Sequence, residues 1–275
     1  MLRVGVFGAG GRMGAAVCAA VRADPELELV AAVDPAYAGT ALGPGGLVVA
    51  PGPDALVEAG AEVAVDFTLA SAVAANAAWC AAHGVHAVIG TTGLTAEALA
   101  EMERSFAPGP ANCVFAPNFA IGAVLMMRFA ELAAPWFETV EVVELHHDGK
   151  LDSPSGTALQ TARRIAAARD AARSGAAGTG AASTGATATS ATTTSAGDHG
   201  PARGMEAAPG VQVHSVRLRG LVAHQEVLMG TTGQVLTLRH DSMDRVSFMP
   251  GVLLAVKAVP GRRGFTVGLD ALLGL

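Results

Sequence analysis

Short apolar runs alternate with helical stretches through the first 117 residues of this chain. Runs such as Val63 to Val65 and Ala87 to Ile89 are apolar without a break, which is typical of strands covered on both faces of a sheet. Strands that alternate with helices in this way form βαβ units. The pattern therefore predicts an α/β fold built on a Rossmann-type parallel sheet.

The pattern changes near Ile121, where a long apolar helix is expected to run to Leu132. An alternating strand, "VEVVELHH", follows it. Three later stretches alternate in the manner of antiparallel strands, namely "VQVHSVRLRG", "AHQEVLMG" and "QVLTLRHD". We therefore predict a dinucleotide-binding domain of residues 1–117 and 246–275, and an α+β domain of residues 118–245 with an open mixed sheet for substrate binding and assembly.

Residues 174–197 form a low-complexity tract in which all 24 residues are Ala, Gly, Ser or Thr. Such a composition buries too little apolar side chain to offset the entropy of ordering. We expect a disordered insertion at the surface.

Composition excludes several classes of protein. The formal net charge of -6 argues against nucleic-acid binding, which needs an excess of Lys and Arg. No stretch offers the ~20 unbroken apolar residues of a membrane span. Cys18, Cys80 and Cys113 lie far apart, so they are expected to be buried apolar residues of a protein in a reducing cytoplasm.

A glycine-rich turn, "GAGGRMG", follows the first strand and opens a helix. Gly8, Gly11 and Gly14 let the backbone approach a pyrophosphate at the helix N-terminus, although a tight turn without a ligand has the same glycines. Asp34 ends the second strand, where an acid accepts hydrogen bonds from an adenosine ribose. An acid there favours NADH, while Arg12 partly compensates the charge of a 2′-phosphate, so both NADH and NADPH stay open.

Two further strands end in segments expected to contact the cofactor. "GTTG", residues 90–93, lies at the carboxyl edge of the sheet, where parallel sheets bind ligands, although an ordinary turn is the alternative. "APNF", residues 116–119, ends the next strand and is expected to contact the nicotinamide and to act as a hinge between the domains.

"ELHHDGKLDSPSGTA", residues 144–158, concentrates titratable and hydrogen-bonding groups. His146 and His147 point to opposite faces of an extended strand, and the Asp-Gly turn can fold Lys150 back towards a histidine. Ser155, Gly156 and Thr157 begin a helix whose exposed N–H groups suit a carboxylate. The segment predicts carboxylate recognition beside a proton donor.

Three other interpretations of this segment compete. Adjacent histidines plus a lysine are a poor ligand set for a metal, so no metal site is predicted. Either histidine alone can be a structural residue. Helix capping by Ser155 is compatible with a functional role.

These residues carry a resemblance to a known family. The chain resembles the 4-hydroxy-tetrahydrodipicolinate reductases (dihydrodipicolinate reductases), and its later stretches look like the actinobacterial branch. The similarity rests on "GAGGRMG", "VDFT", "HAVIGTTG", "APNFAIG", "ELHHDGKLDSPSGTA" and "VHSVRLRG". It covers nearly the whole chain outside the low-complexity tract.

The resemblance implies reduction of a cyclic imine with two carboxylates, in diaminopimelate and lysine biosynthesis. Water leaves from C4, a hydride from NADH or NADPH adds there, and a proton donor quenches the negative charge. By motif position that donor is His146, assisted by Lys150, while His147, Gly156 and Thr157 hold a carboxylate. The residues matched to the cofactor are Gly8, Gly11, Arg12, Met13, Gly14, Asp34, Gly90, Thr92, Ala116 and Phe119.

The resemblance also implies a homotetramer assembled through the sheet of the second domain. Two alternatives belong to other classes of protein. One is another two-domain dehydrogenase of amino-acid metabolism, which does not require the residue 146–158 motif. The other is a dinucleotide-sensing protein without turnover, which predicts that the donor groups are absent.

Overall fold

The computed structural model describes residues 1–43, 46–107, 109–178 and 204–275, and the chain divides into two compact units. Unit 1 contains Met1–Val124 and Asp244–Leu275, and unit 2 contains Leu125–Met243. The first boundary between the units lies inside a helix, and the second lies one residue after the end of a strand.

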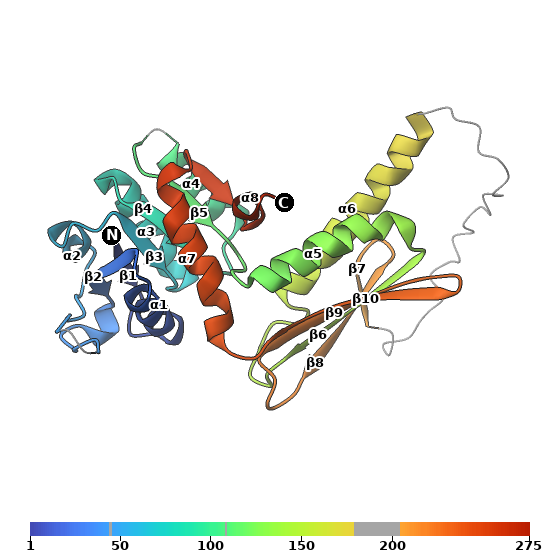
Figure 1. Ribbon diagram of the computed structural model, residues 1–275, viewed down its shortest axis with the longest axis horizontal. Coiled ribbons are helices and arrows are strands. Elements are labelled where there is room, and N and C mark those ends of the chain that lie inside the picture. Colours follow the sequence, from blue (N-terminus) through green and yellow to red (C-terminus); the bar gives the residue numbers. More distant parts are fainter. Residues whose placement is uncertain (44–45, 108, 179–203) are drawn as a thin grey trace. The chain divides into compact units, whose positions relative to one another are not determined.

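The described part of unit 1 forms a six-stranded parallel sheet in the order β11-β5-β4-β3-β1-β2 (Figure 1). Its strands are β1 (Leu2–Phe7), β2 (Leu27–Val33), β3 (Val63–Asp66), β4 (His86–Ile89), β5 (Cys113–Phe115) and β11 (Phe265–Val267). Its helices are α1 (Arg12–Ala23), α2 (Asp54–Glu58), α3 (Ala70–His83), α4 (Ala96–Phe106), α7 (Met249–Ala258) and α8 (Asp270–Leu273). The Rossmann-type prediction is confirmed, and β11 is a short strand that the periodicity did not predict.

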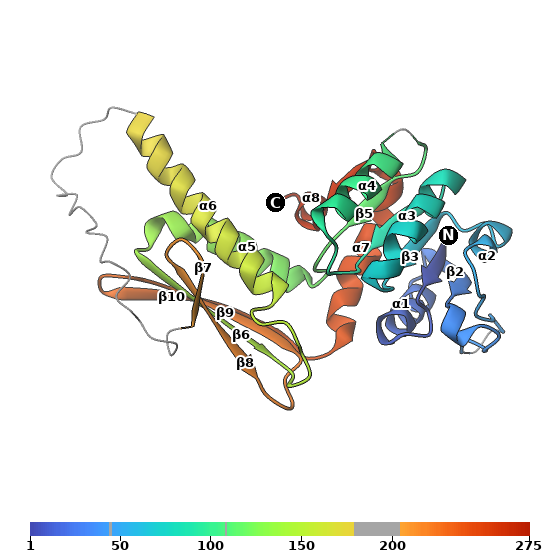
Figure 2. The same cartoon turned by 180° about the vertical axis from the view of Figure 1, so that it is seen from behind.

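Helices cover both faces of this sheet, which explains its unbroken apolar strands. Helix α1 packs with α7, and α3 packs with α4, on opposite faces (Figures 1 and 2). All four residues of β3 are buried, as a strand covered on two sides requires. The three cysteines are buried, as predicted, and burial raises the pKa of the Cys18 thiol to about 11.

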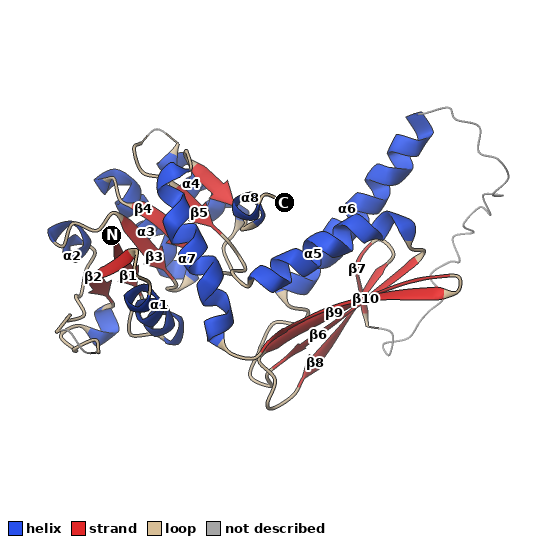
Figure 3. Cartoon of the chain, in the orientation of Figure 1, coloured by secondary structure: helices blue, strands red, loops and turns tan. Residues whose placement is uncertain are grey.

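Unit 2 packs two long helices on one face of a mixed sheet in the order β10-β9-β6-β8-β7 (Figure 3). Its strands are β6 (Thr139–His146), β7 (Met205–Ala208), β8 (Val211–Arg217), β9 (Ala223–Thr231) and β10 (Gln234–Ser242). Its helices are α5 (Ile121–Ala133), which begins in unit 1, and α6 (Gly156–Gly178).

The strand directions in unit 2 correct one expectation. Strands β9 and β10 pair antiparallel, as their alternation predicted, but β8 runs parallel to β6. Alternation reports which face a residue occupies and does not report the direction of the neighbouring strand. The result is the mixed sheet that the fold class predicted.

The low-complexity tract begins inside a helix, because α6 continues through its first residues to Gly178. Residues 174–178, the first part of the tract, therefore belong to a helix. The remainder of the tract, residues 179–197, lies outside the described residues.

No helix in the described ranges combines the length and the apolar character that crossing a membrane demands.

Candidate active site

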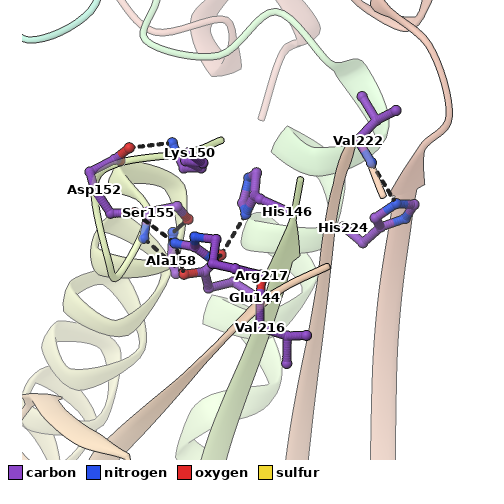
Figure 4. A network of polar contacts seen from close by, with 10 residues as sticks. All are labelled: Glu144, His146, Lys150, Asp152, Ser155, Ala158, Val216, Arg217, Val222 and His224. Carbon is purple, nitrogen blue, oxygen red and sulfur yellow. Dashed lines mark hydrogen bonds and ion pairs between the residues drawn. The ribbon is translucent and has the colours of Figure 1, made fainter. Parts of the chain in front are cut away.

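His146 is the last residue of β6, and its ring contacts a buried carboxylate. Its Nδ1 lies 2.5 Å from Oε2 of Glu144, whose side chain is fully buried (Figure 4). Burial acts to raise the pKa of the Glu144 carboxyl, but hydrogen bonds from His146, Arg217 and Ser215 outweigh it and lower the pKa to about 2. The carboxylate is therefore ionised and accepts hydrogen bonds only.

The segment after His146 forms the turn that the sequence predicted. The backbone N–H of Lys150 donates to the carbonyl of His147 at 3.2 Å, which closes the Asp-Gly turn. The Lys150 ammonium pairs with Asp152 at 2.7 Å. His147 is exposed.

Helix α6 begins as predicted, with Ser155 as its N-terminal cap. The hydroxyl of Ser155 accepts a hydrogen bond from the backbone of Ala158 at 3.2 Å, and Ser155 itself is buried. Gly156 is exposed, and no atom lies within 4 Å of where a side chain on it would begin. Gly156 therefore leaves space beside the first turn of the helix, and the N-terminus of a helix is an end that suits an anion.

The predicted cofactor residues of unit 1 lie at the carboxyl edge of its parallel sheet. Four of them follow four different strands, in the spatial order Ala116 after β5, Gly90 after β4, Gly8 after β1 and Asp34 after β2. The sheet reverses its order of connection between β1 and β3, the topological switch point where such folds bind nucleotides.

The glycine turn fits a pyrophosphate in its local geometry. Gly8 has φ +70°, and a methyl group on Gly14 would lie 2.0 Å from the carbonyl oxygen of Gly8. Helix α1 begins after Gly11 with neither a side-chain cap nor an acidic residue in its first turn, while Arg12 is exposed and Met13 half-buried. The first turn of α1 can therefore offer its N–H groups to a phosphate.

Asp34 is already engaged by the backbone of the turn. Its Oδ2 accepts from Gly10 N–H and its Oδ1 accepts from Ala36 N–H, each at 3.1 Å. Each carboxylate oxygen has a further lone pair for a ribose hydroxyl.

Aromatic rings pack at the β4 end of this edge. A side chain on Gly90 would begin 2.1 Å from the ring of Phe67, which contacts the buried Phe119 at 5.6 Å between ring centroids. Ala116 is fully buried, and Thr92 is exposed on the "GTTG" segment.

Sequence reasoning missed a buried acid beneath this edge. Asp66 accepts hydrogen bonds from the Thr68 amide and hydroxyl at 2.8 and 2.6 Å, from Asn76 at 2.8 Å, and from Thr91 at 3.2 Å. The sequence signal for this residue was its position at the end of an unbroken apolar strand, where an acid lies at the edge of the sheet.

Sequence reasoning also missed Glu144 and Arg217 in unit 2. The alternation Val140, Val142, Glu144 along β6 was the available signal, because it places the carboxylate on the buried face with two valines.

Profiles for dihydrodipicolinate reductase match both parts of the chain, the N-terminal profile over residues 2–119 and the C-terminal profile over residues 122–273. The chain belongs to the dihydrodipicolinate reductase family. A 4-hydroxy-tetrahydrodipicolinate reductase of Nocardia farcinica is 52% identical over 275 residues, covering 100% of this chain and 99% of its own. One from Cutibacterium acnes is 49% identical over 276 residues, covering 100% of both chains.

Solved structures agree with this family. A dihydrodipicolinate reductase from Paenisporosarcina sp. TG-14, with dipicolinate bound, has 37% identity and a TM-score of 0.79, covering 98% of this chain and 99% of the other. An amine dehydrogenase from Mycobacterium smegmatis, at 16% identity and a TM-score of 0.61, shares the fold alone.

Membership in the dihydrodipicolinate reductase family confirms the predicted class and activity. The chain is an NAD(P)H-dependent oxidoreductase that reduces 4-hydroxy-tetrahydrodipicolinate in diaminopimelate and lysine biosynthesis. The predicted similarity to the actinobacterial branch is also confirmed, since both relatives named above are actinobacterial.

Proposed function

We propose that the turn and helix tip at residues 146–157 hold the substrate of this reductase, with His146 as the proton donor. The observation that carries the proposal is the 2.5 Å contact between His146 Nδ1 and the ionised Glu144. Because this carboxylate can only accept, Nδ1 carries a hydrogen, and Nε2 is left as the nitrogen that exchanges a proton with a ligand.

The substrate is a ring with two carboxylates, so its site needs positive charge and N–H donors. Lys150, His147 and the first N–H groups of α6 at Gly156 and Thr157 supply them. Ser155 caps the same helix tip. That a relative binds dipicolinate, also a ring dicarboxylate, supports this assignment.

Reduction of the ring requires one hydride and one proton. Reduced nicotinamide, when bound, supplies the hydride to C4 of the ring after the 4-hydroxyl has left as water. His146 holds the proton at Nε2 and gives it to the ring as electron density moves away from C4. Lys150 holds a carboxylate and stabilises the negative charge that develops in the ring before the proton arrives.

Unit 1 holds the dinucleotide in this proposal. Gly8, Gly11 and Gly14 with Arg12 and Met13 contact the pyrophosphate and its surroundings, and Asp34 accepts from the adenosine ribose. Gly90, Thr92, Ala116 and Phe119 contact the nicotinamide half. The enzyme takes NADH or NADPH, with Asp34 favouring NADH because a 2′-phosphate brings a like charge towards its carboxylate.

We also propose a homotetramer assembled through the sheet of unit 2. In the described part of the unit, α5 and α6 lie on one face of the sheet, and no helix covers the other (Figures 1 and 2). That open face carries Val143 and Leu228 beside polar contacts such as the Arg239–Glu226 ion pair at 3.3 Å and the His214–Glu141 hydrogen bond at 2.6 Å. A broad face of this kind supports self-association. The buried free cysteines support a cytoplasmic location.

Single substitutions test the catalytic assignment. In His146→Ala or Lys150→Ala, turnover should fall by about two to four orders of magnitude, the range for a lost acid-base group, while NADH affinity stays unchanged. Steady-state rates with enzymatically generated substrate and a fluorescence titration with NADH measure the two effects. His83→Ala, which removes an exposed histidine of α3, is the control. Weakened NADH binding with an intact rate would contradict the assignment.

A further inference from the structure

The buried Glu144 carboxylate accepts hydrogen bonds from several elements of unit 2. Its two carboxylate oxygens accept from His146 at 2.5 Å, from both terminal nitrogens of Arg217 at 2.9 and 2.8 Å, and from the backbone N–H of Ser155 at 3.2 Å (Figure 4). These donors come from three elements, namely β6, β8 and the start of α6. One buried group therefore contacts both the proton donor and the residue that caps the anion-binding helix tip.

Arg217 extends this network to the turn. Its Nη2 also donates to the carbonyl of Asp152 at 2.6 Å, and the next residue, Leu218, donates its N–H to the carbonyl of His146 at 3.0 Å. Asp152 in turn pairs with Lys150. A side chain on β8 thus links the carboxylate on β6 to the loop that carries the lysine.

Resting on the function proposed for His146, we propose that Glu144 is a positioning residue that aligns the proton donor and the substrate-carboxylate site together, with Arg217 tying the 147–154 loop to it. Through His146 it selects the Nδ1–H tautomer and the direction of Nε2. Through Ser155 it holds the first turn of α6 against the end of β6.

A purely structural role explains these contacts less well. Taking a carboxylate and a guanidinium out of water has a large desolvation penalty, and buried ion pairs are often no more stable than an apolar pair of similar size. Its contacts with His146 and Ser155, which belong to the proposed site, give a functional reason for a charge at this position. The two interpretations differ in what the loss of the charge does to turnover.

The test is a double-mutant cycle on Glu144→Gln and His146→Ala. Glu144→Gln should lower kcat by about ten- to a hundred-fold, the range for residues that orient a functional histidine from behind. An uncharged amide no longer stabilises the His146 ring with a hydrogen on both nitrogens, which is the form that can give a proton from Nε2. The double variant should have the kcat of His146→Ala within about three-fold, because the effect on kcat acts through His146.

Binding of dipicolinate separates the second arm of the proposal from the first. Measured by calorimetry in the presence of NADH, the affinity should fall in Glu144→Gln and in the double variant by the same factor. The affinity for dipicolinate should fall less in His146→Ala alone. Rates and binding therefore report the two functions of one carboxylate independently.

Ile165→Val is the control for stability. Ile165 is fully buried in α6 within the core of unit 2, so its shortening lowers Tm without touching the network. It should keep the kcat of the unsubstituted enzyme. Glu144→Asp keeps the charge opposite Arg217 and is the second variant, for the case that the Gln variant does not fold. Its shorter side chain should also lower kcat, because it cannot reach His146 and Ser155 at once.

The proposal would be overturned if the double variant lost kcat by the product of the factors lost in the two single variants. It would also be overturned if Glu144→Gln or Glu144→Asp had the same kcat as Ile165→Val. Unchanged dipicolinate affinity would overturn its second arm. If His146→Ala itself had full activity, the proposed function would fail, and that outcome is distinct from a failure of the Glu144 inference.

Discussion

Asp34 shows how a single carboxylate can be fixed before a ligand arrives. The backbone N–H groups of Gly10 and Ala36 hold one oxygen each at 3.1 Å, so the carboxylate cannot rotate away from the glycine turn without losing both bonds. A ribose hydroxyl can donate to the remaining lone pairs. A 2′-phosphate in the same place would bring negative charge towards a carboxylate that is held in position.

Asp34→Ser should therefore shift the preference towards NADPH. We expect the ratio of kcat/KM for NADPH to that for NADH to rise by about ten-fold, which corresponds to about 1.4 kcal/mol of removed repulsion. Asp54→Ser changes the net charge equally at an exposed acid of α2 and should leave the ratio unchanged. Initial rates with NADPH and with NADH measure this ratio of kcat/KM. An unchanged ratio in Asp34→Ser would mean that this carboxylate does not face the ribose.

At the scale of elements, the helix starts of the two proposed sites differ in their caps. Helix α1 has no side-chain cap, and its N-terminus opens directly after the glycine turn. Helix α6 is capped by Ser155, and α4 is capped by Thr95, whose hydroxyl accepts from Ala98 N–H at 3.2 Å. An uncapped start leaves its N–H groups for a phosphate, whereas a capped start fixes the direction of the remaining N–H groups.

Ser155→Ala and Thr95→Ala form a matched pair that separates stability from binding. Each should lower the free energy of unfolding by about 1 kcal/mol, the usual effect of losing a cap. Only Ser155→Ala should also weaken dipicolinate binding, because the tip of α6 frays where the carboxylate is held. Urea unfolding and calorimetry measure the two quantities. Equal dipicolinate affinities in the pair would argue against the helix tip as the anion site.

At the scale of the whole molecule, the sheet of unit 2 has two very different faces. Val142, Val213 and Val227 on one face pack against α6 residues such as Ala162 and Ile165. The opposite face is uncovered in the described part of the unit and mixes apolar residues with ion pairs. Assembly through this face would bury its apolar residues without any change in the fold.

Leu228→Arg, in the middle of β9 on the open face, should disperse the proposed tetramer. A buried charge without a partner is strongly unfavourable at an interface, so sedimentation should show smaller species at micromolar concentrations. Val57→Arg places the same charge on an exposed apolar residue of α2 in unit 1 and should leave the tetramer intact. A tetramer that survives Leu228→Arg unchanged would place the interface elsewhere.

Much of the fold follows from local chemistry alone. Unbroken apolar runs such as β3 and the glycine turn at Gly8 and Gly14 predict a parallel sheet with a phosphate-binding start, because these patterns depend on neighbours in the chain. The cap at Ser155 and the turn before Lys150 are equally local. The motif at residues 144–158 was recognisable for the same reason: its groups are adjacent in sequence.

Only the tertiary structure decided which distant groups complete the site. Arg217 lies 73 residues beyond Glu144 and meets it because β8 pairs in parallel with β6, a direction that alternation does not encode. Thr91 reaches Asp66 across 25 residues for a similar reason, since β3 and β4 end at the same edge. Sequence pattern determines which face a side chain occupies, whereas strand order and register determine its partner, and a buried charge depends on that partner.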